Sequence, residues 1–168
     1  MTLYHGSNVE IDEILLEKCH KYKDFGQGFY TTRFESQAER MARRTVRRHG
    51  GTPSVTVFTL DERALAGVNY KMFPRVDNDW AMFIMNNRDK KFTDVHSELS
   101  NHDNKYDVVS GAVANDDIAT TFALFRDGII DSHILAARLE YKELNNQYSF
   151  HTEKAVGLLK KTGVFKYA

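Results

Sequence analysis

The stretch Asp24-Phe25-Gly26-Gln27-Gly28-Phe29-Tyr30-Thr31-Thr32 decides how the rest of the chain is interpreted. Gly26 and Gly28 predict a tight turn with a positive φ or a close backbone approach, because glycine lacks the Cβ that prevents both. The aromatic and β-branched residues 29–32 predict a short strand directly after that turn. Such a strand holds Tyr30 at a fixed place near exposed backbone amides. We therefore expect the Tyr30 ring to form a flat floor for a planar ligand.

The composition indicates a single globular domain over residues 1–168, large enough to bury a core. Lys+Arg and Asp+Glu both number 23, and this net charge of zero argues against a broad nucleic-acid or membrane footprint. The N-terminus lacks the pattern of a signal peptide, and no stretch approaches the roughly 20 apolar residues of a membrane span. The single cysteine, Cys19, excludes a disulfide within the chain. We expect a cytoplasmic protein with no membrane partner.

The predicted elements indicate an α+β fold, because strands and helices alternate irregularly and no repeat is present. We expect strands at 3–5, 29–32, 53–60, 68–73, 106–114, 147–151 and 164–167. We expect helices at 12–19 and 35–48, one turn at 61–62, and further helices at 79–88, from Asp116 or Asp117 to 128, from Asp131 or Ser132 to 144, and from 152 toward 163. Residues 90–105 are polar and irregular, which predicts a mobile surface loop, and whether it forms a lid stays open.

Metal and thiol chemistry are not expected. No pair of the seven histidines has zinc-like spacing, and Cys19 lies on an apolar face of a predicted helix. Gly26-Gln27-Gly28 continues into a strand, which is the wrong context for a dinucleotide-binding helix start. The arginines of residues 40–48 favour a solvated helix face, and the alternative is a phosphate or substrate patch.

Three segments together resemble the motifs of the ADP-ribosyltransferase superfamily, in its diphtheria-toxin and poly(ADP-ribose) polymerase branch. They are Tyr4-His5-Gly6-Ser7, Phe25-Gly26-Gln27-Gly28-Phe29-Tyr30 and Asn146-Gln147-Tyr148. The branch has a His-Gly-[Ser/Thr] strand, a Phe-Gly-x-Gly-[aliphatic]-Tyr segment and a Glu at the start of a late strand. The whole chain also resembles a bacterial family of that clan, described as a domain of unknown function, some of whose members occur in toxin–antitoxin-like gene pairs.

This resemblance implies two small split antiparallel sheets, with surrounding helices, that hold NAD in a cleft. By the family's pattern, His5 bonds a ribose hydroxyl and the Gly6 backbone holds the nicotinamide carboxamide, with Ser7 nearby. The segment that contains Gly28 presents Tyr30, which stacks on the nicotinamide ring. The physics agrees, since the oxidised ring is a flat cation that a tyrosine face attracts.

The sequence departs from the family's pattern at Gln147, where the family normally has Glu. Gln147 can orient the ribose, but it cannot take a proton. We expect the missing charge to cost several kcal/mol of transition-state stabilisation, on the order of a thousandfold in rate. Three alternatives stay open: an acceptor that needs little activation, a contribution from Glu153, or NAD binding with little transfer.

The prediction is an NAD-dependent mono-ADP-ribosyltransferase with His5, Tyr30 and Gln147 as its triad. The acceptor is an unknown protein or nucleic acid, and nicotinamide is released. A toxin-type enzyme of this kind would have a small antitoxin-like partner protein that masks the cleft. The alternatives are an NAD or ADP-ribose binding module with little catalysis and an NAD glycohydrolase, in which water is the acceptor.

Overall fold

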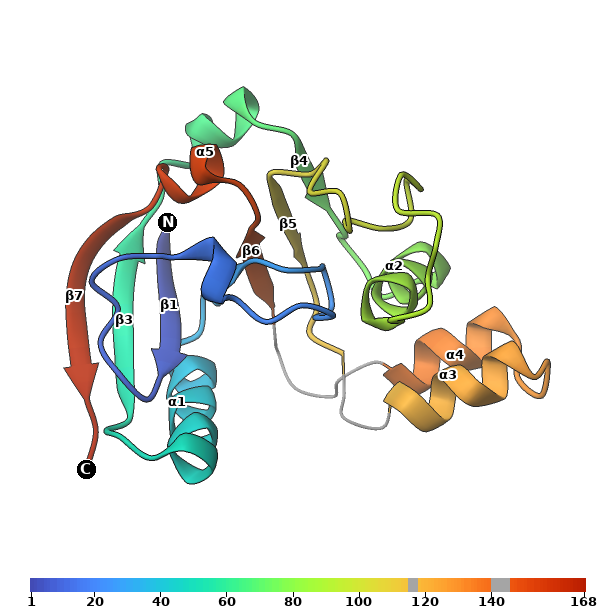
Figure 1. The fold of residues 1–168 in the computed structure, drawn as a ribbon, viewed down its shortest axis with the longest axis horizontal. Coiled ribbons are helices and arrows are strands. Elements are labelled where there is room, and N and C mark those ends of the chain that lie inside the picture. Colours follow the sequence, from blue (N-terminus) through green and yellow to red (C-terminus); the bar gives the residue numbers. More distant parts are fainter. Residues whose placement is uncertain (115–117, 140–145) are drawn as a thin grey trace.

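The computed structural model describes residues 1–114, 118–139 and 146–168, which form two sheets with helices outside them (Figure 1). The three-stranded sheet has the order β1-β3-β7, with β1 (Thr2–Ser7), β3 (Ser54–Thr59) and β7 (Lys160–Lys166). The four-stranded sheet has the order β2-β6-β5-β4, with β2 (Phe29–Thr31), β6 (Gln147–Phe150), β5 (Val108–Gly111) and β4 (Tyr70–Met72). Both sheets are antiparallel except for the parallel pair β4–β5. The α+β class is confirmed, and the expectation of wholly antiparallel sheets is corrected at this edge.

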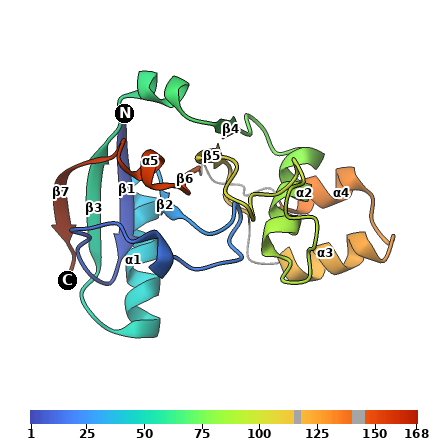
Figure 2. The ribbon, with the colours of Figure 1, turned by 45° about the horizontal axis from the view of Figure 1, so that its top comes forward.

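Most of the helices lie on the outer sides of the two sheets, whereas the short last helix lies between them (Figure 2). They are α1 (Glu35–His49), α2 (Asn78–Arg88), α3 (Ile118–Arg126), α4 (Ser132–Leu139) and α5 (Glu153–Val156), with 3₁₀ helices η1 (Leu16–Lys18) and η2 (Glu62–Gly67). The longest of them, α1, runs beside β1 and β3, whereas α2, α3 and α4 gather beyond the four-stranded sheet. One face of the four-stranded sheet is therefore covered by these three helices, and the other faces the three-stranded sheet.

Two apolar clusters follow from this layering. Between the sheets, Leu3 and Phe58 of the three-stranded sheet pack with Phe150 of the four-stranded sheet. On the other face of the four-stranded sheet, Phe25 and Trp80 belong to the cluster that α2 helps to form. Trp80 is fully buried, as the apolar stripe of its helix predicts.

Two of the expected helices are wrong. The helix at 12–19 is only the turn η1, because tertiary bonds hold the chain before it extended. The Ile11 amide donates to Thr56 Oγ1 at 3.0 Å, and Lys161 Nζ donates to Asp12 Oδ1 at 2.6 Å. The last helix ends at Val156 because β7 starts at Lys160, earlier than expected. The expected cap at 116 or 117 and the helix end at 144 lie outside the described residues.

Helix α1 packs on β1 at a glycine. Ala38 and Ala42 form a buried cluster with Val55 of β3. A Cβ on Gly6 would lie 1.9 Å from the Ala38 carbonyl oxygen and 2.9 Å from the Ala42 amide nitrogen. Any side chain at position 6 would therefore push the helix backbone away from the sheet.

We predict that Gly6→Ala lowers the free energy of unfolding by about 3 kcal/mol or more, because helix backbone cannot yield as a flexible side chain can. Gly67→Ala is the matched control, since a Cβ at Gly67 meets nothing within 4 Å. Urea unfolding of both variants measures the difference. Equal midpoints for the two variants would show that α1 does not press on β1 in this way.

Candidate functional site

The glycine stretch is a turn that two backbones approach closely. Gly26 has a φ of +94°, and a Cβ on Gly28 would lie 2.6 Å from His151 Nδ1 and 2.7 Å from the Phe150 carbonyl oxygen. Both expectations for these glycines, a positive φ and a close approach, are confirmed. The turn leads directly into β2, which presents Tyr30.

The two sheets meet where β1 and β2 separate. Tyr4 and Thr32 exchange backbone hydrogen bonds of 2.8 and 2.9 Å. The next ladder partner of this antiparallel pair would be Gly6 opposite Tyr30, but His5 Nδ1 bonds the Tyr30 carbonyl oxygen at 2.6 Å instead. Because alternate residues of a strand direct their polar groups to the same edge, the N–H and C=O of Gly6 point out from β1. Among the described residues, neither group has a hydrogen-bond partner.

The His5 imidazole is neutral, with a defined tautomer. A carbonyl oxygen can only accept, so Nδ1 carries the proton and Nε2 presents a lone pair. Burial lowers the pKa of His5 to about 4, and the charge of Lys23 contributes in the same direction. The ring also stacks on Phe29, at 4.3 Å between centroids. Within the described part of the chain, Nε2 makes no hydrogen bond, so it can accept one from a ligand.

The hydroxyl of Tyr30 is fixed by hydrogen bonds, whereas its ring makes none and is the part that a ligand could stack on. The hydroxyl donates to the Gly26 carbonyl oxygen at 2.7 Å and accepts from the Phe25 amide at 2.9 Å. Burial raises the pKa of Tyr30 well above its usual value, so the phenol stays neutral. The ring is half-buried, and Lys23 Nζ lies 5.1 Å from its centroid. The face expected to receive a planar cation is therefore covered by a cation from the protein itself.

Gln147 is buried, and its amide nitrogen is held by acceptors. Nε2 donates to Asp24 Oδ2 at 2.8 Å and to the Ala112 carbonyl oxygen at 3.3 Å. These bonds fix the orientation of the carboxamide, with Nε2 facing Asp24. The Oε1 atom makes no hydrogen bond within the described residues. Gln147 thus offers a neutral acceptor where a glutamate would offer a charged one.

Asp24 is a site residue to which the sequence analysis gave no role. Its side chain is only 5% exposed. Oδ1 accepts from Nε of Arg88 at 2.7 Å and also from Nη2, and Oδ2 accepts from the Ala114 amide at 3.2 Å. The available signal was the position of Asp24 beside the glycine turn, but nothing local to the sequence paired it with Arg88.

The structure places His5 beside the backbone of Tyr30, and it places Tyr30 and Gln147 on one face of the four-stranded sheet. The His5 ring itself stacks on Phe29, whose side chain alternates with that of Tyr30 to the other face of the sheet. The His5 imidazole bonds the backbone carbonyl oxygen of Tyr30. Tyr30 pairs with Ser149 of β6, and Gln147 lies two residues before Ser149 on the same strand. The side chains of Tyr30 and Gln147 therefore point to the same face of the four-stranded sheet. Ser7 lies at the end of β1, where its hydroxyl contacts Asn8 Oδ1 at 3.4 Å. Glu153 is exposed and follows the other end of β6, so the structure does not bring it to Gln147.

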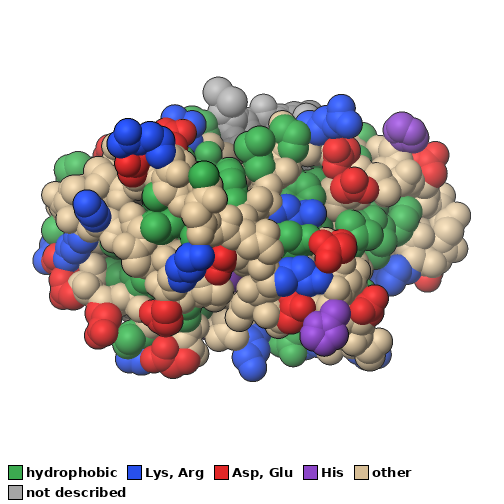
Figure 3. Space-filling model, turned by 90° about the horizontal axis from the view of Figure 1, so that it is seen from above, with side chains coloured by type: hydrophobic (Ala, Val, Ile, Leu, Met, Phe, Trp, Pro, Cys, Tyr) green, Lys and Arg blue, Asp and Glu red, His purple; other side chains and the backbone are tan. Residues whose placement is uncertain are grey.

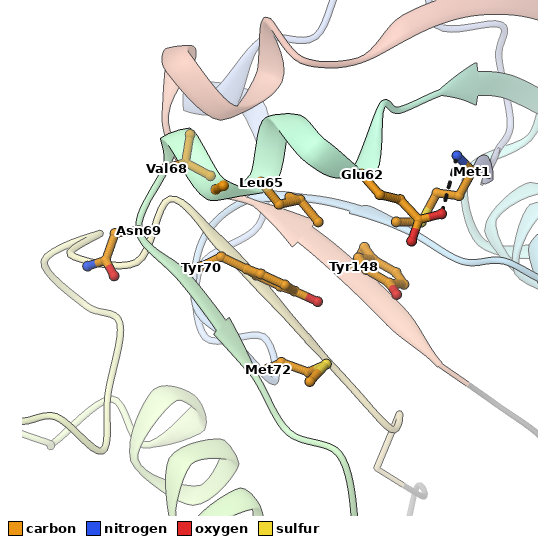
Figure 4. A pocket seen from close by; sticks show the side chains of 9 residues that line it. Met1, Glu62, Leu65, Val68, Asn69, Tyr70, Met72 and Tyr148 are labelled. Carbon is orange, nitrogen blue, oxygen red and sulfur yellow. Dashed lines mark ion pairs between the residues drawn. The ribbon is translucent and has the colours of Figure 1, made fainter.

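A separate cavity of about 620 Å³ lies on the other face of the four-stranded sheet. Tyr70 and Tyr148 point into it beneath Leu65 of η2 (Figure 4). Because side chains alternate along a strand, Tyr148 faces away from its neighbour Gln147. This cavity therefore does not contain the predicted triad.

The residues that the structure describes contain no group of three or more histidine, cysteine, aspartate or glutamate side chains placed to hold a metal ion. No helix among them has both the length and the apolar character needed to cross a bilayer.

Comparison with known proteins gives a family but no activity. The model of a family described as "Protein of unknown function (DUF3990)" matches residues 1–161. Neither the curated proteins nor the solved structures contain a match. The chemistry of the site must therefore be argued from its own geometry.

We predict that acid destabilises the fold through buried histidines. Burial lowers the pKa of both His5 and His151 to about 4. In the unfolded chain the pKa of a histidine is about 6.5. Between pH 4 and pH 6.5 the unfolded state therefore binds more protons than the folded state. The free energy of unfolding is highest above pH 6.5 and falls toward pH 4, by at most about 1.4 kcal/mol per pH unit for each histidine.

Urea unfolding of the wild type and of His5→Asn between pH 7.5 and 4.5 measures this dependence. The variant should show a shallower slope, whereas substitution of the exposed His133 by Asn should leave the slope unchanged. Identical slopes for wild type and His5→Asn would contradict a half-buried His5 that stays neutral.

Proposed function

The chain belongs to the DUF3990 family, and on this premise we propose that it is an NAD-dependent mono-ADP-ribosyltransferase. One observation carries the proposal. The imidazole of His5 bonds the Tyr30 carbonyl oxygen, so the backbone N–H and C=O of Gly6 have no hydrogen-bond partner among the described residues at this edge of β1. An unpaired N–H and C=O on one residue suit a primary carboxamide, which offers one donor and one acceptor in return. Nicotinamide carries such a group on a flat, cationic ring.

The ring of Tyr30 is the proposed partner of nicotinamide. A tyrosine face attracts cations, and Lys23 already occupies this position at 5.1 Å. Binding of NAD would exchange one cation for another on the same face. The hydroxyl of Tyr30, which bonds Gly26 and Phe25, has a structural role and needs no contact with NAD.

Two neutral acceptors are proposed to orient the ribose. The lone pair of His5 Nε2 and the Oε1 atom of Gln147 can each accept a hydrogen bond from a hydroxyl. Because Gln147 Nε2 donates to Asp24, the Gln147 side chain is fixed in one rotamer and its Oε1 atom is already oriented for the ribose. Preorganisation of this kind is the main contribution that these two side chains can make.

The proposed reaction breaks the bond between nicotinamide and ribose and joins the same ribose carbon to an acceptor nucleophile. Nicotinamide leaves with the bonding electron pair, and the acceptor loses a proton. The transition state resembles that of glycoside hydrolysis, with positive charge on the ribose. Gln147 cannot take a proton, and a histidine of pKa about 4 is only a weak base, so the proposed acceptor is one that needs little activation.

The pairing of Asp24 favours a second candidate, an NAD-binding module with little catalysis. Asp24, the carboxylate nearest to Gln147, is buried and already paired with Arg88. NAD labelled in its adenylate part separates the candidates. Label that moves onto a macromolecule supports a transferase, free ADP-ribose indicates a glycohydrolase, and binding without release of nicotinamide indicates the module. Absence of NAD binding would overturn all three.

We predict that Tyr30→Ala reduces NAD affinity more than tenfold, whereas Tyr30→Phe retains it within about threefold. Phenylalanine keeps the ring, and its missing hydroxyl leaves the Phe25 amide and Gly26 carbonyl without a partner. The Phe variant should therefore lose about 1–2 kcal/mol of stability while it still binds. Calorimetric titration and urea unfolding measure the two effects. Full NAD binding by Tyr30→Ala would contradict the assignment.

We predict that Lys23→Met strengthens NAD binding, because the competing ammonium is removed while an aliphatic stem remains. A cation–π contact contributes about 0.5–2 kcal/mol, which corresponds to roughly 2- to 30-fold in affinity. Lys21→Met is the control with the same charge change, since Lys21 is exposed two residues away. Weaker binding by Lys23→Met than by Lys21→Met would show that Lys23 contacts NAD instead of competing with it.

A further inference from the structure

Strand β6 and the residue after it carry a row of polar side chains in the interior of the protein. On the surface shown in Figure 3, acidic and basic side chains are interspersed, as is usual where water surrounds them. The row on β6 is buried instead. It consists of Gln147, Ser149 and His151, at alternate positions, and none of the three is more than 7% exposed. We call these three residues the polar row. The other face of β6 carries Tyr148 and Phe150, which pack in the apolar cluster between the sheets.

The hydrogen bonds of His151 connect the polar row to the glycine turn at residues 26–28. His151 Nδ1 lies 2.7 Å from the Gln27 carbonyl oxygen, which can only accept, so Nδ1 carries the proton. Nε2 therefore has a lone pair and accepts from the Ser149 hydroxyl at 2.7 Å. Burial lowers the pKa of His151 to about 4, which keeps this neutral tautomer at neutral pH. Each nitrogen of the imidazole thus has one defined partner.

The glycine turn is closely fitted to His151. A Cβ on Gly28 would lie 2.6 Å from His151 Nδ1, so the turn has no room to move toward the imidazole. The Gln27 side chain donates to the carbonyl oxygens of Leu16 at 3.2 Å and of Cys19 at 3.0 Å. The middle residue of the turn is therefore held at its side chain by η1 and at its carbonyl group by His151.

The same turn fixes the ring of Tyr30. The Tyr30 hydroxyl bonds the Gly26 carbonyl oxygen and the Phe25 amide, so this side chain spans from β2 to the turn. The rings of His151 and Tyr30 also meet in a T-shaped contact, with centroids 6.3 Å apart and planes at 85°. A movement of residues 26–28 would therefore tilt the Tyr30 ring.

We propose that His151 is a positioning residue for the nicotinamide of NAD, which acts through the glycine turn to fix the stacking face of Tyr30. The inference rests on the proposed function, because it takes the Tyr30 ring as the partner of nicotinamide. Since His151 is only 3% exposed, it acts through Tyr30 and not by contact with NAD.

Packing alone does not call for the polar row. A buried polar group costs free energy unless it is hydrogen-bonded, and replacing a bonded pair by apolar groups of the same shape can be nearly neutral for stability. Hydrogen bonds are directional, whereas apolar contacts are not. What the bond from His151 to Gln27 adds is therefore a fixed orientation of the turn, and a binding site needs such support behind the residues that touch the ligand.

Two substitutions at position 151 separate the two hydrogen bonds of the imidazole. The amide nitrogen of asparagine can take the place of Nδ1, so His151→Asn keeps a donor for the Gln27 carbonyl oxygen and loses the partner of Ser149. The longer side chain in His151→Gln can place its amide where Nε2 lies, so this variant keeps a partner for Ser149 and leaves the Gln27 carbonyl oxygen free. Each variant loses one hydrogen bond, and each is the matched control for the other.

We expect His151→Gln to weaken NAD binding about tenfold, the equivalent of one well-formed hydrogen bond, and His151→Asn to bind within about threefold of the wild type. Calorimetric titration at neutral pH measures the affinities, and urea unfolding shows that both variants fold. NMR spectra of the NAD-free protein with isotope-labelled tyrosine give a second readout. The Tyr30 ring signals, assigned with Tyr30→Phe, should shift in His151→Gln and not in His151→Asn.

Equal NAD affinities of the two variants would overturn the positioning role of His151 and leave the proposed function intact. A larger loss in His151→Asn than in His151→Gln would also overturn it, because the effect would then run through Ser149 and not through the turn. If the wild type does not bind NAD, the proposed function fails. The Tyr30 signals then decide by themselves whether His151 fixes that ring, and unchanged signals in His151→Gln would show that it does not.

Discussion

The buried carboxylate of Asp24 is the interaction on which the candidate site depends. It accepts hydrogen bonds from Arg88 at the end of α2, from the Ala114 amide after β5 and from Gln147 at the start of β6. A charge this deep is stable only when it is paired and fully hydrogen-bonded. These contacts therefore tie the glycine turn to three segments that lie far apart in the sequence.

A second consequence of burial is that the three predicted triad residues are all neutral at pH 7. His5 has a pKa of about 4, the pKa of Tyr30 is raised well above its usual value, and Gln147 has no proton to exchange. Such a site can bind, orient and stack, but at neutral pH it offers only weak bases. This explains why a transferase and a binding module both fit the same geometry, and why the nucleophilicity of the acceptor decides between them.

The sequence predicted local features well and distant pairings poorly. The strand after Gly26 and Gly28 and the buried position of Trp80 followed from glycine conformation and helical periodicity. The helix expected at 12–19 was wrong because Thr56 and Lys161 hold that segment extended, and these contacts are not visible locally. For the same reason the roles of Asp24 and Lys23 were missed. Each depends on partners brought close only by the fold.

A crystal structure of the protein with NAD bound would place the nicotinamide within or outside this site. We expect the nicotinamide carboxamide to bond the backbone N–H and C=O of Gly6, the ring to lie on Tyr30 and the Lys23 ammonium to have moved from that ring. NAD in the cavity beside Tyr70 and Tyr148, or a nicotinamide ring that contacts neither Gly6 nor Tyr30, would contradict this placement.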